Sequence, residues 1–600
     1  MPRQGGRQPP APAIQRKSLV SILSPTPGTN RTIRKRWLLV SLTLAVSASA
    51  RSVTAQERNV YWGDTHLHTS YSGDAYNWGN ASAGPETAYR FAKGLPVTHP
   101  TLLNRVRLDR PLDFLVVADH SGGLFGRGAP VEGRRNTPEF QQAVWSLYVD
   151  AAERNNDPGT FTALIGWEWT AMTPENLHRV VFTPADGETA KRFLPASPQS
   201  TGARPEDLWN WLEMTSDRLG IDFVAIPHNS NLSLGLMFDM VDSEGRPISA
   251  EYARTRMRWE PLVEVLQIKG TSETHPLLSP IDEFANFELY EVLLRSGVAD
   301  PDPAAGSYAR TGLLRGLDIE DRVGVNPYKF GLQAGTDSHT SLSTSDEDNF
   351  WGKTVLDSSP EGGATQTPSP FGGNWDVVGW DYAAQGLTGA WATENTRDAL
   401  TAAFKRKEVY ATSGPRIQLR MFGGFEFDAE DANARDIAAV GYGRGVPMGG
   451  DLAQAPNDSP VSLLIHAVKD PVGANLDRVQ VIKGWLDEDG DTNERVYDVE
   501  WAGDRRRDPN GRVPAIGSTV DVERLTYDNR IGSAELSTVW VDPDFDPDER
   551  AFYYVRVLEI PTLRHSTYDA VALGQDPAEA TARPSVIQER ALSSPIWYTP

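Results

Sequence analysis

The chain has 600 residues, a length that favours two folded units plus a tail. Its 17 tryptophans argue against disorder over most of the chain, and the absence of cysteine excludes disulfides, thiol catalysis, iron–sulfur clusters and cysteine-ligated zinc. The formal charge is −22, and residues 1–55 carry nine basic and no acidic residues, which leaves −31 on the remainder. Such an acidic chain is a poor non-specific binder of nucleic acid or anionic lipid.

The first 55 residues have the pattern of an export signal. A basic segment at 31–36 leads into an apolar stretch at 37–46, which is shorter than the ~20 residues needed to span a bilayer. Small side chains at Val53 and Ala55 predict signal-peptide cleavage after Ala55. We therefore expect residues 1–55 to be a disordered N-terminus with a secretory signal, and the mature protein to be periplasmic or secreted without a stable membrane anchor. An uncleaved membrane anchor is the alternative.

A His-x-His pair occupies positions 66 and 68, and Asp74 follows six residues after the second histidine. On an extended strand, residues i and i+2 point to the same side, so His66 and His68 can bind one cation together while Leu67 faces the packing. Two ordinary core histidines would give the same pattern. The interpretation therefore depends on the partners that follow in the chain.

Four continuous apolar runs, at 112–118, 161–165, 223–227 and 330–334, are typical of strands buried on both faces of a parallel sheet. Helical stretches such as 206–219 and 281–294 lie between them. Active sites of parallel barrels and doubly wound sheets gather at the carboxyl ends of the strands. Histidine, aspartate or glutamate follows each run, and we expect these residues to meet in one site: His120, Glu168, His178, His228, Asp337 and His339.

Taken in order, these motifs resemble the metal motifs of the polymerase and histidinol phosphatase (PHP) superfamily, over residues 58–415. The phrases at 167–170, 176–179 and 349–353 resemble more narrowly an exported, uncharacterised bacterial branch of PHP-like metal-dependent hydrolases. The resemblance implies an α/β fold, with a distorted (β/α)7 PHP-type barrel over residues 56–415. It also implies two or three divalent metal ions, of manganese, zinc or iron.

The resemblance also implies how the ligands are divided. One metal ion would be held by His66, His68, Glu168 and Asp337, and Glu168 would bridge to a second ion held with His178 and His228. A third would take Asp74, His120 and His339. Many relatives have histidine where this chain has Asp74, and an oxygen ligand there favours manganese or iron over zinc.

The expected function is an exported metal-dependent hydrolase of the phosphoesterase kind, in which a metal-bound hydroxide at a di- or trinuclear centre attacks phosphorus. Glu168, Asp337 and His339 are the predicted catalytic residues, and either His339 or a metal-bound water protonates the leaving group. The alternatives are hydrolysis of a non-phosphate ester or amide, and a non-catalytic module that binds metal or another ligand.

Charge arithmetic favours a small anionic substrate such as a phosphate ester. Three divalent ions and three carboxylates leave the cavity near +3 if the imidazoles are neutral. Arg179, Lys269 and Lys353 are candidate substrate-binding residues at its rim, although solvated surface charge is an equally good interpretation of each. Nucleic acid is not an expected partner.

Beyond residue 415, short alternating runs at 417–421, 461–465, 479–482 and 551–557 are typical of an antiparallel β-sandwich. Residues 416–600 are therefore expected to form a β-rich C-terminal domain without a catalytic cluster. The acidic segment 487–491 resembles a calcium loop superficially, but glycine is absent from its sixth position and strand patterns flank it. We interpret it as an acidic hairpin turn.

Overall fold

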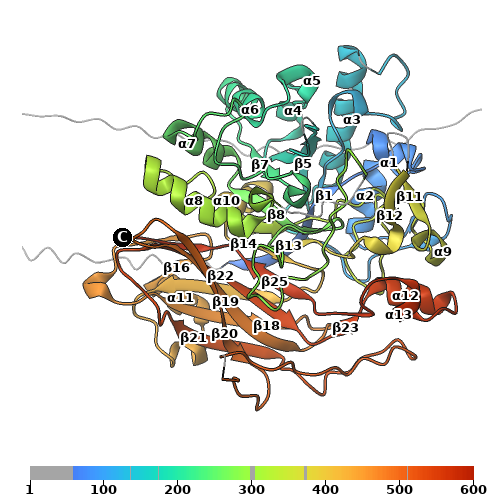
Figure 1. Cartoon of the computed structure of the whole chain (residues 1–600). Coiled ribbons are helices and arrows are strands. Elements are labelled where there is room, and N and C mark those ends of the chain that lie inside the picture. Colours follow the sequence, from blue (N-terminus) through green and yellow to red (C-terminus); the bar gives the residue numbers. More distant parts are fainter. Residues whose placement is uncertain (1–57, 136, 173–174, 298–303, 370–373, 510) are drawn as a thin grey trace, which may run out of the picture. The chain divides into compact units, whose positions relative to one another are not determined.

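The computed structural model describes residues 58–135, 137–172, 175–297, 304–369, 374–509 and 511–600 (Figure 1). The predicted signal peptide and its cleavage site lie outside these ranges. Residues 55–600 belong to one compact unit. Among the residues described, no helix combines the length and the apolar character needed to cross a membrane.

A mixed sheet of 13 strands runs through this unit and joins strands from distant parts of the chain. Strands β1, β4 and β5 pair in parallel, whereas β13 is antiparallel to β1, and β6 is antiparallel to both β5 and β7. The order along the sheet is β17 (Asp451–Ala453), β26 (Ile596–Thr599), β22 (Arg550–Glu559), β25 (Arg590–Ser593), β14 (Val409–Thr412), β13 (Leu387–Ala392), β1 (Asn59–Leu67), β4 (Phe114–Val117), β5 (Thr162–Trp169), β6 (Arg179–Thr183) and β7 (Val224–Pro227). Two further strands lie off this path: β19 (Leu476–Leu486) pairs with β22, and β20 (Thr492–Trp501) pairs with β19. The fold class is therefore mixed α/β.

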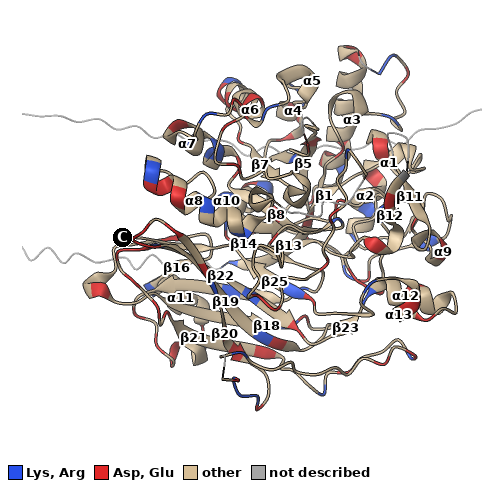
Figure 2. Ribbon diagram, viewed as in Figure 1, with Lys and Arg blue, Asp and Glu red and all other residues tan. Residues whose placement is uncertain are grey.

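Helices connect strands in the first half of the chain. The helix predicted at 206–219 is confirmed by α6, whereas the one predicted at 281–294 is wrong, since these residues form turns and irregular backbone. Helix α3 illustrates how the helices begin: Pro138 is its first residue, and the Thr137 hydroxyl accepts a hydrogen bond from the Phe140 amide. The helices are α1 (Gly73–Asn77), α2 (Pro85–Ala92), α3 (Pro138–Asn155), α4 (Gly187–Ala190), α5 (Pro198–Thr201), α6 (Pro205–Leu219), α7 (Ala250–Trp259), α8 (Ala309–Val323), α9 (Pro360–Gly363), α10 (Arg397–Lys405), α11 (Ile437–Arg444), α12 (His565–Ala572) and α13 (Pro577–Ala580). Figure 2 colours the ribbon by charge, and both basic and acidic residues lie along α8.

A smaller sheet brings further strand ends towards β1. It consists of β10 (Gly331–Ala334), β8 (Leu262–Gln267) and β9 (Gly270–Thr271), and β10 is parallel to β8. Just beyond β10, the Ser338 carbonyl accepts a hydrogen bond of 2.9 Å from the His68 amide. A parallel bridge also links His120, after β4, to Glu168 on β5. The carboxyl ends of β1, β4, β5 and β10 are therefore neighbours.

The C-terminal part is rich in antiparallel strands. Strands β15 (Gln418–Gly424), β16 (Val446–Pro447), β18 (Ser462–Val468) and β21 (Glu535–Val541) form a four-stranded antiparallel sheet. Apolar side chains of this sheet share one core cluster with those of β19 and β22. The expected domain boundary at residue 415 stays a prediction, and β14 pairs with β25 across it. The short strand pairs are β2 (Val97–Thr98) with β3 (Arg105–Val106), β11 (Gln366–Pro368) with β12 (Asn374–Val378), and β23 (Thr562–Leu563) with β24 (Val586–Ile587).

The acidic segment 487–491 is the turn between β19 and β20, which pair in antiparallel fashion. The Asp487 carboxylate accepts hydrogen bonds from the Asp489 and Asp491 amides and from the Asn493 side chain. The hairpin interpretation is therefore confirmed.

A buried ion-pair network joins β22 to the segment after β9. The Arg556 guanidinium lies 2.6 and 3.0 Å from the two carboxylate oxygens of Asp282. Arg310 pairs with Asp282 at 2.8 Å and with Glu273 at 2.7 Å, and the Tyr554 hydroxyl also donates to Glu273. Burial alone would raise the pKa of Asp282, but Arg556 and Arg310 outweigh it and hold that pKa far below its usual value.

We predict that Arg556→Ala lowers the free energy of unfolding by about 3–5 kcal/mol, because it leaves Asp282 buried with one of its two arginines missing. Arg524→Ala is the control, since that side chain is 81% exposed and pairs with Asp521 at the surface. It should cost less than about 1 kcal/mol. Urea unfolding of both variants measures the difference, and similar small losses would show that the network contributes little.

Candidate metal centre

Four buried side-chain atoms converge from the ends of three strands. They are Nε2 of His66 on β1, Nε2 of His68 just after it, Oε2 of Glu168 on β5 and Oδ1 of Asp337 after β10. His66 Nε2 lies 3.2 Å from His68 Nε2, 3.6 Å from Glu168 Oε2 and 3.5 Å from Asp337 Oδ1. His68 Nε2 lies 3.1 Å from Glu168 Oε2 and 3.3 Å from Asp337 Oδ1.

The spacing of His66, His68 and Asp337 fits part of the ligand shell of one metal ion, and these three residues form one group of possible ligands. Tetrahedral ligands at the 2.0–2.1 Å typical of zinc–nitrogen bonds stand about 3.3–3.4 Å apart, and the distances among the three lie around that value. Glu168 Oε2 lies at a similar distance from both histidines. Two imidazoles and two carboxylates are a donor set that divalent transition metals accept. Without a cation, two imidazole nitrogens and two anionic oxygens would face one another in a buried space, which is costly unless protons are added.

The free ring nitrogen of His66 has a carboxylate partner that the sequence analysis missed. Nδ1 of His66 lies 3.1 and 3.3 Å from the carboxylate oxygens of Glu264, on β8. An Nδ1–H that donates to Glu264 leaves the Nε2 lone pair free for a metal, which is the usual arrangement of ligating histidines. The signal in the sequence was a glutamate inside the otherwise apolar strand 262–266.

Glu168 faces a second group of ligands with its other oxygen. Oε1 lies 2.6 Å from Nδ1 of His178 and 3.2 Å from Nε2 of His228. Burial opposes ionisation of Glu168, but His120, His178 and His228 outweigh it and hold the pKa of the carboxyl well below its usual range. Glu168 therefore lies between two groups of candidate ligands, in the position that a bridging ligand would have.

Asp74 stands at the centre of a third group. Its Oδ2 lies 2.9 Å from Nε2 of His120 and 2.7 Å from Nε2 of His339, and His68 adjoins the same group. The structure thus brings together all nine residues predicted as metal ligands. Their role as ligands stays a prediction.

Two buried aspartates that the sequence analysis did not single out tie the strand ends together. Asp64 on β1 accepts hydrogen bonds from the backbone and hydroxyl of Thr336 and from the Ser343 hydroxyl. Asp119 accepts hydrogen bonds of 2.5 and 2.6 Å from the backbone amide and hydroxyl of Thr69. Asp337 itself has a φ of 53°, a left-handed conformation that is uncommon for aspartate. These contacts fix the backbone beneath the candidate ligands.

Lys269 and Lys353 lie inside the site. Lys353 Nζ is 2.8 Å from both Asp337 Oδ1 and His339 Nδ1, and Lys269 Nζ pairs with Asp337 Oδ2. Both side chains are buried and line the cavity at the centre. The two lysines therefore offset the negative charge of Asp337. They also face the cavity in which a substrate would bind.

Arg179 is not at the cavity, contrary to the expectation from the sequence. It is 1% exposed, its Nε donates to Glu260 at 2.9 Å, and a terminal nitrogen donates to the Leu177 carbonyl. The alternation along β6 explains the difference, since His178 faces the site and the next residue faces the other side. The structure therefore assigns Arg179 to a buried ion pair.

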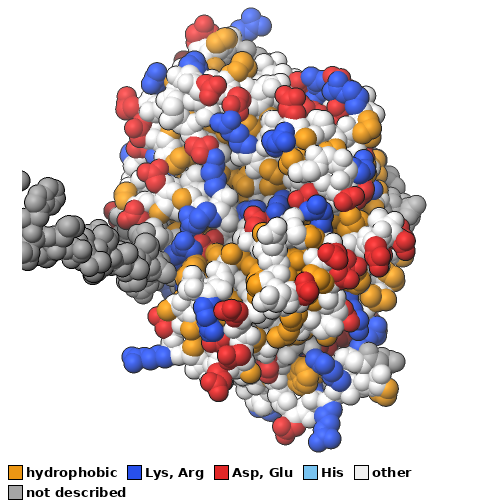
Figure 3. Space-filling view, turned by 90° about the vertical axis from the view of Figure 1, so that its left-hand side faces the viewer, with side chains coloured by type: hydrophobic (Ala, Val, Ile, Leu, Met, Phe, Trp, Pro, Cys, Tyr) orange, Lys and Arg blue, Asp and Glu red, His pale blue; other side chains and the backbone are white. Residues whose placement is uncertain are grey.

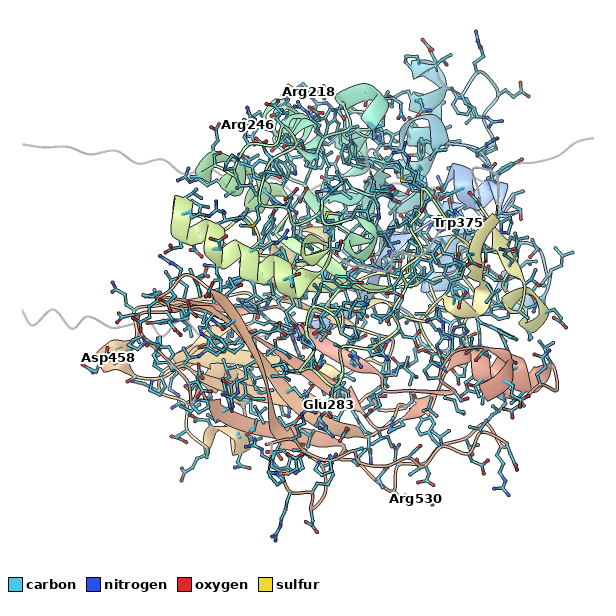
Figure 4. The ribbon with its side chains drawn as sticks, in the orientation of Figure 1. Arg218, Arg246, Glu283, Trp375, Asp458 and Arg530 are labelled. Atoms are coloured by element: carbon cyan, nitrogen blue, oxygen red, sulfur yellow. The ribbon has the colours of Figure 1, made fainter. Side chains whose placement is uncertain are left out.

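The cavity enclosed by these residues measures about 40 Å³, enough for a few water-sized groups. Candidate ligands and the two lysines form part of its lining. The apolar lining residues are Trp78, Met172, Leu294 and Trp375. Trp375 comes from β12 and is labelled in Figure 4.

Fold and site together define a mixed α/β protein with buried histidine–carboxylate groups that are suited to metal ions. The chain belongs to the family described as "Protein of unknown function (DUF3604)", whose model matches residues 55–131 and 127–600. A search of curated proteins gave no match. A solved two-domain protein from Bacteroides vulgatus, described as containing a predicted PHP-like metal-dependent phosphoesterase, is similar over 73% of this chain and 85% of its own. Its identity is 11% and its TM-score 0.28, too low to establish a common fold, and membership of the PHP superfamily stays a prediction.

We predict that the purified mature protein, reconstituted with manganese, zinc or iron, holds at least two divalent ions per chain. His68→Ala should lower that content, because His68 adjoins two of the three groups. His466→Ala is the control, since His466 lies on β18 and pairs with Glu535 at the surface. Elemental analysis measures all three proteins, and a wild-type chain that stays metal-free would contradict the assignment.

We further predict that Glu264→Gln weakens metal affinity about 10–100-fold, the range typical of a lost partner of a ligating histidine. Competition with a chromogenic chelator measures the affinity. Glu260→Gln is a matched control, because Glu260 is equally buried but pairs with Arg179 and Arg256. Equal losses of affinity in the two variants would indicate a general effect of folding on the site.

Proposed function

We propose that this protein is a metal-dependent hydrolase of small anionic esters, with a phosphate ester as the preferred class. The observation that carries the proposal is the close spacing of His66, His68 and Asp337, with one oxygen of Glu168 beside the two histidines and the other turned towards His178 and His228. A carboxylate that turns one oxygen towards each of two groups of candidate ligands suits a two-metal hydrolytic site. Divalent ions bound there would supply Lewis acidity and an activated water molecule.

The charges of the cavity support an anionic substrate only when cations are bound. Asp74, Glu168 and Asp337 bring three negative charges, and Lys269 and Lys353 bring at most two positive ones. The side chains alone would therefore repel an anion, and divalent ions would reverse the sign. The two lysines also remain close enough to bind oxygens of a substrate that enters beside Asp337.

Hydrogen bonding at His339 supports a role as a ligand. Its Nδ1 lies 3.0 Å from the Asp337 backbone carbonyl and 2.8 Å from the Lys353 ammonium, so it donates to the carbonyl only if Lys353 donates to Asp337 and not to His339. In that tautomer, the Nε2 lone pair is directed at the group around Asp74. The predicted catalytic role of His339, as proton donor to the leaving group, stays a prediction.

The finer description of the fold is also part of this proposal. Strands β1 and β4–β7 pair in sequence, β8 pairs with β10, and a bridge from Leu67 to Ser338 connects the end of β10 to β1. This arrangement supports a distorted, TIM-like (β/α)7 barrel that opens between β7 and β8. The antiparallel β6 is a departure from the all-parallel barrel expected.

The two alternative functions remain open to a direct test. A cavity of about 40 Å³ takes only the reacting group of an ester, and p-nitrophenyl esters report the cleavage of that group directly. The metal-loaded protein should therefore be assayed with p-nitrophenyl phosphate, bis(p-nitrophenyl) phosphate and p-nitrophenyl acetate. Cleavage of the acetate alone would favour a carbonyl substrate, and metal binding without any turnover would favour a binding module.

We predict that Glu168→Gln lowers turnover of the cleaved ester at least ~100-fold, which is about 2.7 kcal/mol of barrier. The amide keeps the shape of the side chain but loses its charge and one oxygen. Glu188→Gln on α4, whose side chain is 93% exposed, should leave turnover unchanged. Metal content is measured on the same samples, and equal rates for wild type and Glu168→Gln at equal metal loading would remove Glu168 from the centre.

A further inference from the structure

A second cavity lies outside the candidate metal centre and shares none of its lining residues. It measures about 470 Å³, within the range of small-molecule sites. Its walls come from the end of β22, the residue before β25, the segments 345–348 and 470–474, and helix α12. The face in Figure 3 shows basic and acidic side chains intermingled. In the lining of this cavity, by contrast, acidic residues outnumber basic ones.

The lining of this cavity is strongly acidic. Seven of its residues are aspartate or glutamate, and Asp470, Glu559 and Glu589 among them are at most 3% exposed. Arg110 is the one basic lining residue, and its guanidinium lies 2.6 and 2.7 Å from the two carboxylate oxygens of Asp470. Nearby Lys469 donates to the backbone carbonyls of Asp470 and Gly473. Arg416, Arg564 and Arg590 also attract carboxylates of this lining, so cations of the chain offset part of its negative charge.

Glu559 is the residue that points to a ligand. It is 1% exposed, and its Oε1 has no hydrogen-bond partner among the residues that the structure describes. A buried carboxylate oxygen without a donor is unfavourable. Burial and the neighbouring Glu589 and Asp470 raise the pKa of Glu559, and burial raises that of Glu589 to about 7. A positively charged hydrogen-bond donor in the cavity would supply a partner for this oxygen and offset the repulsion between the carboxylates.

The spacing of the carboxylates argues against a single metal ion. Groups of three or more histidine, aspartate or glutamate side chains with ligand atoms within 4.8 Å of one another occur, in the described residues, at the candidate metal centre and not here. Separated carboxylates around a large cavity match a ligand whose positive charges are also separated. Tyr527 and Tyr568 contribute aromatic rings, which attract ammonium groups.

An adjoining cavity extends the same surface. It measures about 210 Å³ and shares Glu347, Asp348 and Tyr568 with the larger one. Trp351 and Trp380 are among its other lining residues. An elongated ligand with a charged end and an apolar chain therefore has room to continue beyond the acidic cavity.

We propose that the acidic cavity binds a small organic cation with two or more separated ammonium groups, anchored by Glu559. An ammonium N–H donates to the unpartnered Oε1 of Glu559, and the remaining positive charges face the carboxylates across the cavity. Recognition is by charge and spacing, so a linear polyamine is the simplest member of this class. The site is independent of the proposed hydrolase activity.

Calorimetric titration of the mature, metal-loaded protein with spermidine at low salt tests the proposal. We expect one spermidine per chain in this cavity, and Glu559→Gln should weaken binding about tenfold or more, as for one hydrogen bond to a charged group. Glu523→Gln is the control, because it removes the same charge from an exposed residue outside the cavity. Its affinity for spermidine should equal that of the wild type.

Three outcomes would overturn the proposal: no binding of spermidine, equal weakening by both substitutions, or displacement of spermidine by one tightly bound Ca²⁺. Equal weakening would indicate general attraction to an acidic chain, and Ca²⁺ binding a metal site. Thermal unfolding serves as the folding check, and Glu559→Gln should melt at or above the wild-type temperature because burial and the neighbouring carboxylates already disfavour a charge at that position. Tyr568→Ala, on the partly exposed face of α12, is a second variant that should also weaken spermidine binding.

Discussion

The structure depends on the placement of three carboxylates, those of Asp74, Glu168 and Asp337, in one buried cluster. Charges of the same sign cannot be buried together unless cations or protons compensate them. The chain supplies Lys269 and Lys353, both in contact with Asp337, and it surrounds Asp74 and Glu168 with histidines. Neutral imidazoles do not complete the compensation but do bind metal ions. The same atoms that make the cluster unfavourable when empty are donors suited to divalent cations.

The surrounding fold serves this placement through hydrogen bonds at the strand ends. Asp64 and Asp119 each accept hydrogen bonds from a backbone amide and a hydroxyl of a neighbouring strand end, so the ends of β1, β4 and β10 hold a fixed register. Sites carried on such rigid ends keep their ligand geometry before any ion binds. Asp337 lies three residues beyond β10, and its amide donates to the His66 carbonyl at 2.6 Å, which helps to hold its left-handed conformation.

Much of the site was predictable from two regularities of β-strands. The i, i+2 rule placed His66 with His68, and the clustering of parallel strand ends placed Glu168 with Asp337. The antiparallel direction of β6 was not predictable, since a buried run reads alike in either direction. Glu264 was missed because its partner, His66, is 198 residues away in the sequence and only the fold joins them. Arg179 was misplaced because a one-residue step along a strand reverses the face.

Buried carboxylates in this chain fall into distinct situations, and the partner of each indicates its role. Asp282 and Glu273 meet Arg310 and Arg556, so their charge is matched within the chain and their role is structural. Glu168 meets several imidazoles, which are neutral donors to a metal. Glu559 meets other carboxylates and has an oxygen without a donor. The first situation needs nothing from outside the chain, whereas the other two leave room for a proton or a cation. Imidazoles beside carboxylates are donors suited to a metal ion, and separated carboxylates beside tyrosines suit an extended organic cation.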